Sequence, residues 1–142
     1  MDWMENGTGA CSMRLDSDGI CTTVYSGLLL PDNFAPLAAR AMQAGADRQA
    51  KGLLSRVDRA AVCCDPASML EAYRHLPPEV RALPAAFVIN PGQADLCGSL
   101  LQGAGAAGLL RRAFFSEAEA RAWLVQTIGA LAANQDWWRK RD

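Results

Sequence analysis

Two adjacent cysteines, Cys63 and Cys64, are the residues of this sequence best suited to covalent chemistry. Asp65 and Pro66 follow them and predict a helix start, because aspartate is a favoured N-cap and proline a favoured first helical residue. A thiolate beside a helix N-terminus is acidified and reactive. The favoured alternative is that both cysteines are small buried side chains, one on each face of a covered strand.

His75 is the only histidine, so any Ser-His-Asp or Cys-His mechanism must use it. We expect it at the end of a helix, just before Pro77 and Pro78, where a cation commonly has a structural role. The five cysteines show no CxxC or other metal-ligand spacing. The sequence therefore predicts no metal site, no cofactor and no catalytic residue.

The run from Gly103 to Gly108 matches the pattern G-x-G-x-x-G. A dinucleotide-binding loop follows a strand and opens a helix, whereas this run follows a predicted helix and precedes a predicted strand. The sequence has no GK[ST] triplet that would indicate a P-loop. We therefore expect the glycines to end a helix.

Length and composition indicate one ordinary globular domain. The chain has 142 residues, of which 51% are hydrophobic and 20% are charged. A net charge of -1 gives no electrostatic case for nucleic-acid binding. No apolar run approaches the ~18 residues of a membrane span, and the acidic start lacks the features of a secretory signal. We expect a cytoplasmic protein with free thiols.

The pattern of apolar residues predicts a single α/β domain with a mixed, mostly parallel sheet, an N-terminal β-hairpin and about four helices, in the order β-β-α-β-α-β-α-β-α. Residues 1–10 are expected to be a mobile lead, residues 11–134 the domain, and residues 135–142 a tail rich in tryptophan and basic residues. Gly27 and Pro31 are expected to end the hairpin. Ser116 is predicted to cap the last helix, with Glu119 completing a capping box.

The end of the sequence resembles the STAS family and its bacterial STAS/SEC14-like branch, which is related to anti-sigma-factor antagonists. The resemblance covers residues 11–132 and is most specific in Gly108–Ser116, GLLRRAFFS, and in Glu119–Leu124, EARAWL. It implies a STAS-like fold and a non-enzymatic module. Members of the family bind a partner protein through the loop and helix after a central strand.

The resemblance also implies a regulated serine or threonine in an Asp-Ser-Ser-Gly-like stretch, which by position corresponds to residues 65–68 here. This sequence departs from that pattern, because the glycine is absent, Pro66 is inserted and Ser68 is the one remaining hydroxyl. Asp65 and Ser68 are therefore the candidate switch and partner loop. The favoured alternative is that Asp65 caps a helix and Ser68 lies in its first turn.

Other residues are candidates for contacts with a partner or a ligand. Arg111 and Arg112 lie in a predicted strand, where one of them suits an edge or an anion. Trp137 and Trp138 precede a basic run that suits a partner subunit or a membrane surface. Five larger side chains are candidates to line a groove between helices and sheet, with core packing as the alternative: Tyr25, Phe34, Met69, Tyr73 and Phe87.

The leading interpretation is a cytoplasmic STAS-like binding or regulatory module. Its expected partner is a protein, with a small apolar ligand and self-association as a homodimer also considered. One alternative is a small α/β enzyme that uses Cys63 or Cys64, assisted by His75 or an arginine. Another is a carrier of lipid or of a small apolar ligand.

Overall fold

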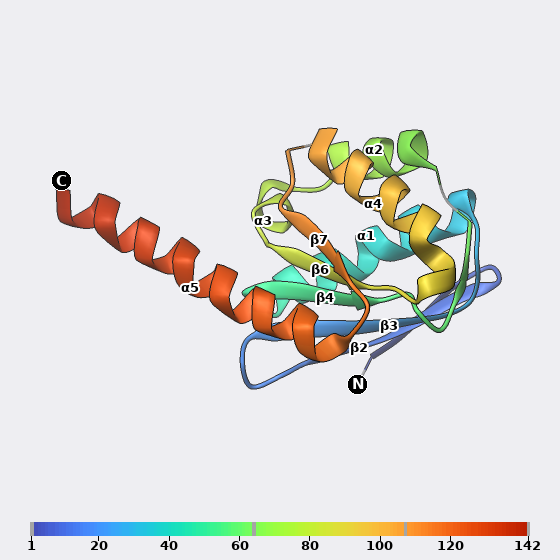
Figure 1. Ribbon diagram of the computed structural model, residues 1–142, viewed down its shortest axis with the longest axis horizontal. Helices are drawn as coiled ribbons and strands as arrows, with labels where there is room; N and C mark the ends of the chain where they lie inside the picture. The colour runs from blue at the N-terminus through green and yellow to red at the C-terminus, as the bar shows by residue number, and fades with distance from the viewer. Residues whose placement is uncertain (1, 64, 107, 142) are drawn as a thin grey trace.

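Among the residues that the structure describes, a mixed sheet has seven strands, and five α-helices accompany it (Figure 1). The computed structural model describes the backbone of residues 2–63, 65–106 and 108–141, and the side chains within these ranges except those of residues 99, 100, 103, 106 and 135–141. The strands are β1 (Asp2–Asn6), β2 (Gly9–Leu15), β3 (Ile20–Leu29), β4 (Gly52–Arg56), β5 (Ala61–Val62), β6 (Ala85–Val88) and β7 (Arg111–Phe114). The α-helices are α1 (Pro31–Asp47), α2 (Pro66–Arg74), α3 (Pro78–Arg81), α4 (Ala94–Ala106) and α5 (Glu117–Arg141), and a 3-10 turn at Pro91–Gln93 precedes α4.

The strand order is β1-β2-β3-β4-β6-β7, and β5 pairs with the end of β3. β1, β2 and β3 are antiparallel neighbours, whereas β3, β4, β6 and β7 run parallel. Gly19 closes the turn between β2 and β3 with a φ of 83°, and its N–H donates to the carbonyl of Asp16 at 3.0 Å. The predicted hairpin and the mostly parallel α/β sheet are confirmed.

The helices divide unequally between the two faces of the sheet. The larger core joins the sheet to α1, α2, α3 and α4, and it includes Leu37, Tyr73 and Val80. Of the described helices, α5 packs by itself on the opposite face, where Ala120 and Leu124 belong to a smaller core. Figure 1 shows α5 crossing the sheet and then continuing well beyond the body of the domain.

The prediction that residues 1–10 form a mobile lead is wrong, because β1 and the start of β2 pair as antiparallel strands over this segment. Asp2 forms an ion pair with Arg48 at the end of α1. The side-chain amide of Asn6 donates to the carbonyl of Asn33 at 3.0 Å. β1 is therefore held by its pairing with β2, by these polar contacts and by the packing of Met4 on the main core, and this short segment has too few apolar residues for hydrophobic periodicity to reveal it.

The expected end of the hairpin at Gly27 is also wrong, because β3 continues to Leu29. Gly27 has a φ of 80°, and a Cβ there would lie 2.3 Å from the carbonyl oxygen of Thr8. Glycine is required at this close approach of two strands rather than as a terminator. The extension gives β5 a parallel partner at Leu28 and Leu29.

Candidate functional site

A cleft of about 400 Å³ lies between the N-terminal half of α1 and the length of α2, and is called here the α1–α2 cleft. Its apolar residues are alanines and prolines, which leave room because their side chains are short. Four polar side chains join them, and they come from both helices. The full lining is Pro31, Asp32, Ala35, Pro36, Ala39, Ser68, Glu71, Ala72 and His75.

Ser68 lies in the first turn of α2 and is tied to the helix cap. Asp65 is the N-cap residue, and its carboxylate accepts a hydrogen bond from the backbone N–H of Ser68 at 2.8 Å. The hydroxyl of Ser68 donates to the second carboxylate oxygen at 2.9 Å. These two bonds, the backbone one first, lower the pKa of Asp65. The predicted cap is confirmed, and the same serine reaches the cleft.

His75 is the C-cap residue of α2 and is exposed. Its Nε2 lies 2.8 Å from a carboxylate oxygen of Glu71, one helical turn earlier. The predicted position at a helix end is confirmed. The pair contributes one acidic and one titratable group to the cleft, and both side chains are largely exposed.

The favoured prediction that Cys63 is buried is wrong, because β5 ends at Val62 and Cys63 lies exposed in the loop before α2. Its backbone N–H still donates to the carbonyl of Leu29 at 2.7 Å. Cys64 lies outside the described residues. Cys11 and Cys21 are buried in the core, as small hydrophobic side chains.

Alkylation at pH 8 is expected to label Cys63 well before Cys11 or Cys21. Burial raises the pKa of Cys11 to about 11 and also raises that of Cys21, so both carry little reactive thiolate and are shielded as well. Peptide mass spectrometry after brief iodoacetamide treatment measures the order. The urea-unfolded chain is the control, in which all three should react alike. Labelling of Cys11 as fast as Cys63 in the native chain would contradict the buried placement.

The five larger side chains predicted as groove candidates do not line the α1–α2 cleft. All are buried in the main core, where α1 and α2 pack on the sheet. The rings of Tyr25 and Phe34 meet edge to face at 5.4 Å between centroids. The core alternative therefore holds for the whole set: Tyr25, Phe34, Met69, Tyr73 and Phe87.

Arg111 is unsuited to direct partner contact, which corrects the prediction, because only 9% of it is exposed. Its guanidinium donates to the carbonyl of Leu83 at 2.6 Å and lies 6.0 Å from the centre of the Tyr73 ring. Burial lowers the pKa of Arg111. Arg112 points to the α5 side of the sheet, is exposed, and lies 5.4 Å from the centre of the Phe114 ring.

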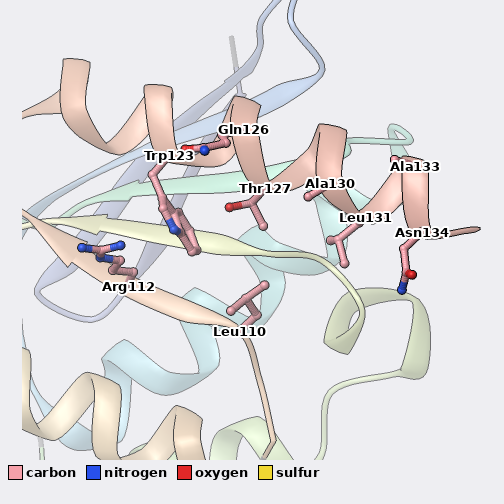
Figure 2. Close-up of a pocket in the computed structure, with 9 residues that line it drawn as sticks. All are labelled: Leu110, Arg112, Trp123, Gln126, Thr127, Ala130, Leu131, Ala133 and Asn134. Carbon is pink, nitrogen blue, oxygen red and sulfur yellow. The ribbon is translucent and has the colours of Figure 1, made fainter.

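A second hollow, the α5–β7 groove, lies between the last strand and the last helix and has a volume of about 1080 Å³ (Figure 2). Trp123 points into it from α5 and packs against Phe114 at 5.8 Å between ring centroids. Arg112 was predicted as a contact residue, whereas none of the α5 residues that line the groove was predicted. The groove is lined by Leu110, Arg112, Trp123, Gln126, Thr127, Ala130, Leu131, Ala133 and Asn134. The side chains of Trp137 and Trp138 lie outside the described residues.

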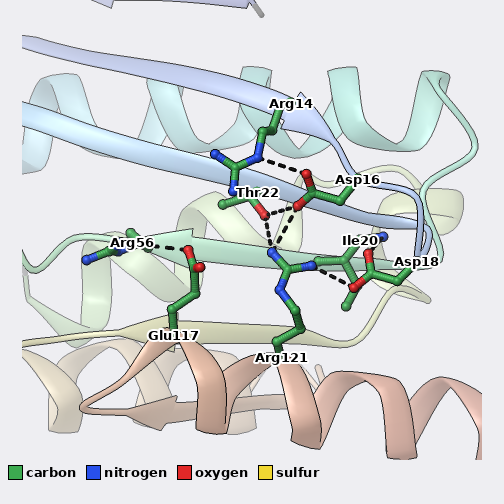
Figure 3. Close-up of polar contacts among 8 residues, drawn as sticks. All are labelled: Arg14, Asp16, Asp18, Ile20, Thr22, Arg56, Glu117 and Arg121. Carbon is green, nitrogen blue, oxygen red and sulfur yellow. Dashed lines mark hydrogen bonds and ion pairs between the residues drawn. The ribbon is translucent and has the colours of Figure 1, made fainter.

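A cluster of charged side chains joins α5 to the turn between β2 and β3 and to the start of β3 (Figure 3). Arg121 donates to Asp18 at 2.7 Å, to Asp16 at 2.9 Å and to the hydroxyl of Thr22 at 2.9 Å. Asp16 also accepts from Arg14 at 2.8 Å. These groups satisfy one another, so we assign the cluster a role in holding α5 on the sheet.

Within the part of the chain that the structure describes, no three histidine, cysteine or acidic side chains are grouped so that they could hold a metal ion. None of the described helices is both long and apolar enough to cross a membrane. No family model, no curated protein and no solved structure matches the chain.

Proposed function

We propose that the chain is a non-enzymatic, cytoplasmic binding module of the STAS type that recognises a protein partner through the α1–α2 cleft. The observation that carries this proposal is the composition of the cleft, in which Ser68 shares one surface with Asp32, Glu71 and His75 over an apolar floor. Its position agrees with the resemblance, which implies recognition by the loop and helix after a central strand.

The shape of the cleft suits side chains of a protein partner. Its volume of about 400 Å³ lies near the lower end of the range of about 300–1,000 Å³ for small-molecule pockets. Such a volume receives a few apolar side chains. Asp32 and Glu71 add two carboxylates, so the matching partner segment carries apolar residues next to a basic residue.

Ser68 is the proposed point of regulation. A phosphate on its hydroxyl would meet the free N–H groups at the start of α2, but it would also compete with the carboxylate of Asp65 for them. It would add negative charge beside Asp32 and Glu71. We therefore propose that phosphorylation at Ser68 weakens binding of a basic partner segment.

The test compares two arginine substitutions at half-buried or exposed alanines. Ala35→Arg places a long, charged side chain in the cleft, whereas Ala122→Arg alters α5 on the other face of the sheet. Each variant and the unchanged chain serve as bait for affinity capture, and the captured protein is then purified and titrated by calorimetry. We expect Ala35→Arg to weaken binding by about tenfold or more, and Ala122→Arg to leave it unchanged.

The proposal fails if every captured protein binds Ala35→Arg as tightly as the unchanged chain. Circular dichroism and urea unfolding of both variants establish that they fold. A peptide segment from the purified partner, titrated with and without added salt, then reports whether the carboxylates of the cleft contribute.

The exposure of Cys63 favours one second candidate, a thiol-dependent enzyme, because the side chain lies in the loop before α2 and is open to solvent. The pH dependence of its alkylation rate separates the two functions. A rate that reaches its maximum near neutral pH would support the enzyme, whereas an ordinary thiol would still gain reactivity above pH 8. A retained apolar molecule in native mass spectrometry would instead support a carrier.

A further inference from the structure

We infer that the α5–β7 groove is closed by a second copy of the chain, with the two α5 helices antiparallel across a twofold axis. The groove lies on the face of the sheet opposite the α1–α2 cleft, so this inference is independent of the proposed function. It rests on the uncovered surface, on the shape of the groove and on the charges along α5.

The first observation is the amount of apolar surface left uncovered around the groove. Leu110 is 47% exposed and Leu131 is 40% exposed, although both line it. β7 ends the strand order, so one side of it lacks a neighbouring strand among the described residues. Open strand edges and contiguous apolar patches commonly mark interaction surfaces.

The second observation is that α5 extends beyond the rest of the domain (Figure 1). It is 25 residues long, which corresponds to about 37 Å, and only its first part packs on the sheet. Every residue from 129 to 134 is exposed, so this stretch is covered less than the first part of the helix. A short helical segment without packing is marginally stable in water, and a helix partner would stabilise it.

The third observation is that the groove and the uncovered helix are the same surface. Ala130, Leu131 and Ala133 form one wall of the groove and also belong to the exposed stretch (Figure 2). In a dimer, residues 129–134 of each copy can therefore lie against the α5–β7 groove of the other copy. This reciprocity is the defining property of a twofold interface.

Small side chains allow two α5 helices to approach closely, and charge favours the antiparallel orientation. Small residues, Gly129, Ala130 and Ala133, lie at the centre of α5, where two helices crossing at their midpoints approach most closely. Glu119 is exposed near the start of the helix, whereas the sequence is basic at residues 139–141, before the final Asp142. An antiparallel pair brings the acidic start of one helix toward the basic end of the other, and it also opposes the helix dipoles favourably.

The test is sedimentation equilibrium of the full chain across the micromolar range, with two arginine variants of α5. Ala130→Arg changes a groove residue, whereas Ala132→Arg changes an alanine that is also exposed but does not line the groove. We expect a concentration-dependent dimer for the unchanged chain, a dissociation constant about tenfold or more weaker for Ala130→Arg, and little change for Ala132→Arg. Both sites are exposed and helical, so both variants should fold.

A charge reversal at Glu119 tests the electrostatic contribution to the dimer. Glu119→Lys is expected to weaken the dimer, and the difference from the unchanged chain should shrink as salt is added. A chain that is monomeric throughout, or a dimer that Ala130→Arg leaves as tight as before, overturns the inference. Ala35→Arg should leave the dimer intact, so failure of the proposed partner site and failure of this interface are separable.

Discussion

Replacing Leu124 with alanine is expected to lower the free energy of unfolding by about 3 kcal/mol. Leu124 is fully buried and packs, with Ala120 of the same helix, in the small core between α5 and the sheet. The surrounding structure relaxes only partially around such a deletion, so the cavity adds to the lost transfer free energy. The other buried members of this core are Ile20, Leu54, Ala86, Val88 and Ala120.

The neighbouring residue supplies the control. Val125 is 50% exposed on the same helix, so Val125→Ala is expected to change the free energy of unfolding by no more than about 0.5 kcal/mol. Urea unfolding, followed by circular dichroism, measures both variants. A loss below about 1 kcal/mol for Leu124→Ala would mean that α5 contributes little to the folded domain. In that case the α5–β7 groove would not be a rigid surface.

The parallel part of the fold was predictable because its signals are local. Apolar runs, Asp65 with Pro66 and the cap at Ser116 each mark an element boundary, and the structure places boundaries there. β1 was not predictable in the same way. Trp3, the largest apolar residue of the strand, is 60% exposed, whereas Met4 is the one that packs on the core, so the apolar residues in the sequence do not show which face of β1 is covered.

The candidate sites were only partly predictable, since each depends on what lies opposite a residue. Arg111 and Arg112 are adjacent on one strand, so the sequence shows that they face opposite ways but not which face holds Tyr73. Ser68 was a candidate from its position. Asp32 and Ala35 lie across the cleft because α1 packs beside α2, and the sequence does not show which helices are neighbours.

Replacing Arg121 with methionine is expected to lower the free energy of unfolding by about 2 kcal/mol at pH 7. Methionine retains an apolar stem and removes the guanidinium that joins α5 to Asp16, Asp18 and Thr22. Charge-assisted hydrogen bonds contribute most when they are shielded from water, and about a quarter of this side chain is exposed. The exposed Arg59 offers a matched control, because Arg59→Met should leave stability nearly unchanged.

The pH dependence of this loss identifies its cause. Burial acts to raise the pKa of Asp16, but hydrogen bonds from Arg14, Thr22 and Arg121 outweigh it, so the pKa in the folded chain lies below its usual value. Such a carboxylate stabilises the fold above its unfolded pKa of about 3.9, and this contribution disappears as pH falls through the lower folded value. Urea unfolding at pH 7 and again in acid should therefore show the difference between the unchanged chain and Arg121→Met shrinking below about pH 4. A difference of the same size in acid would assign the loss to packing of the side chain rather than to its charge.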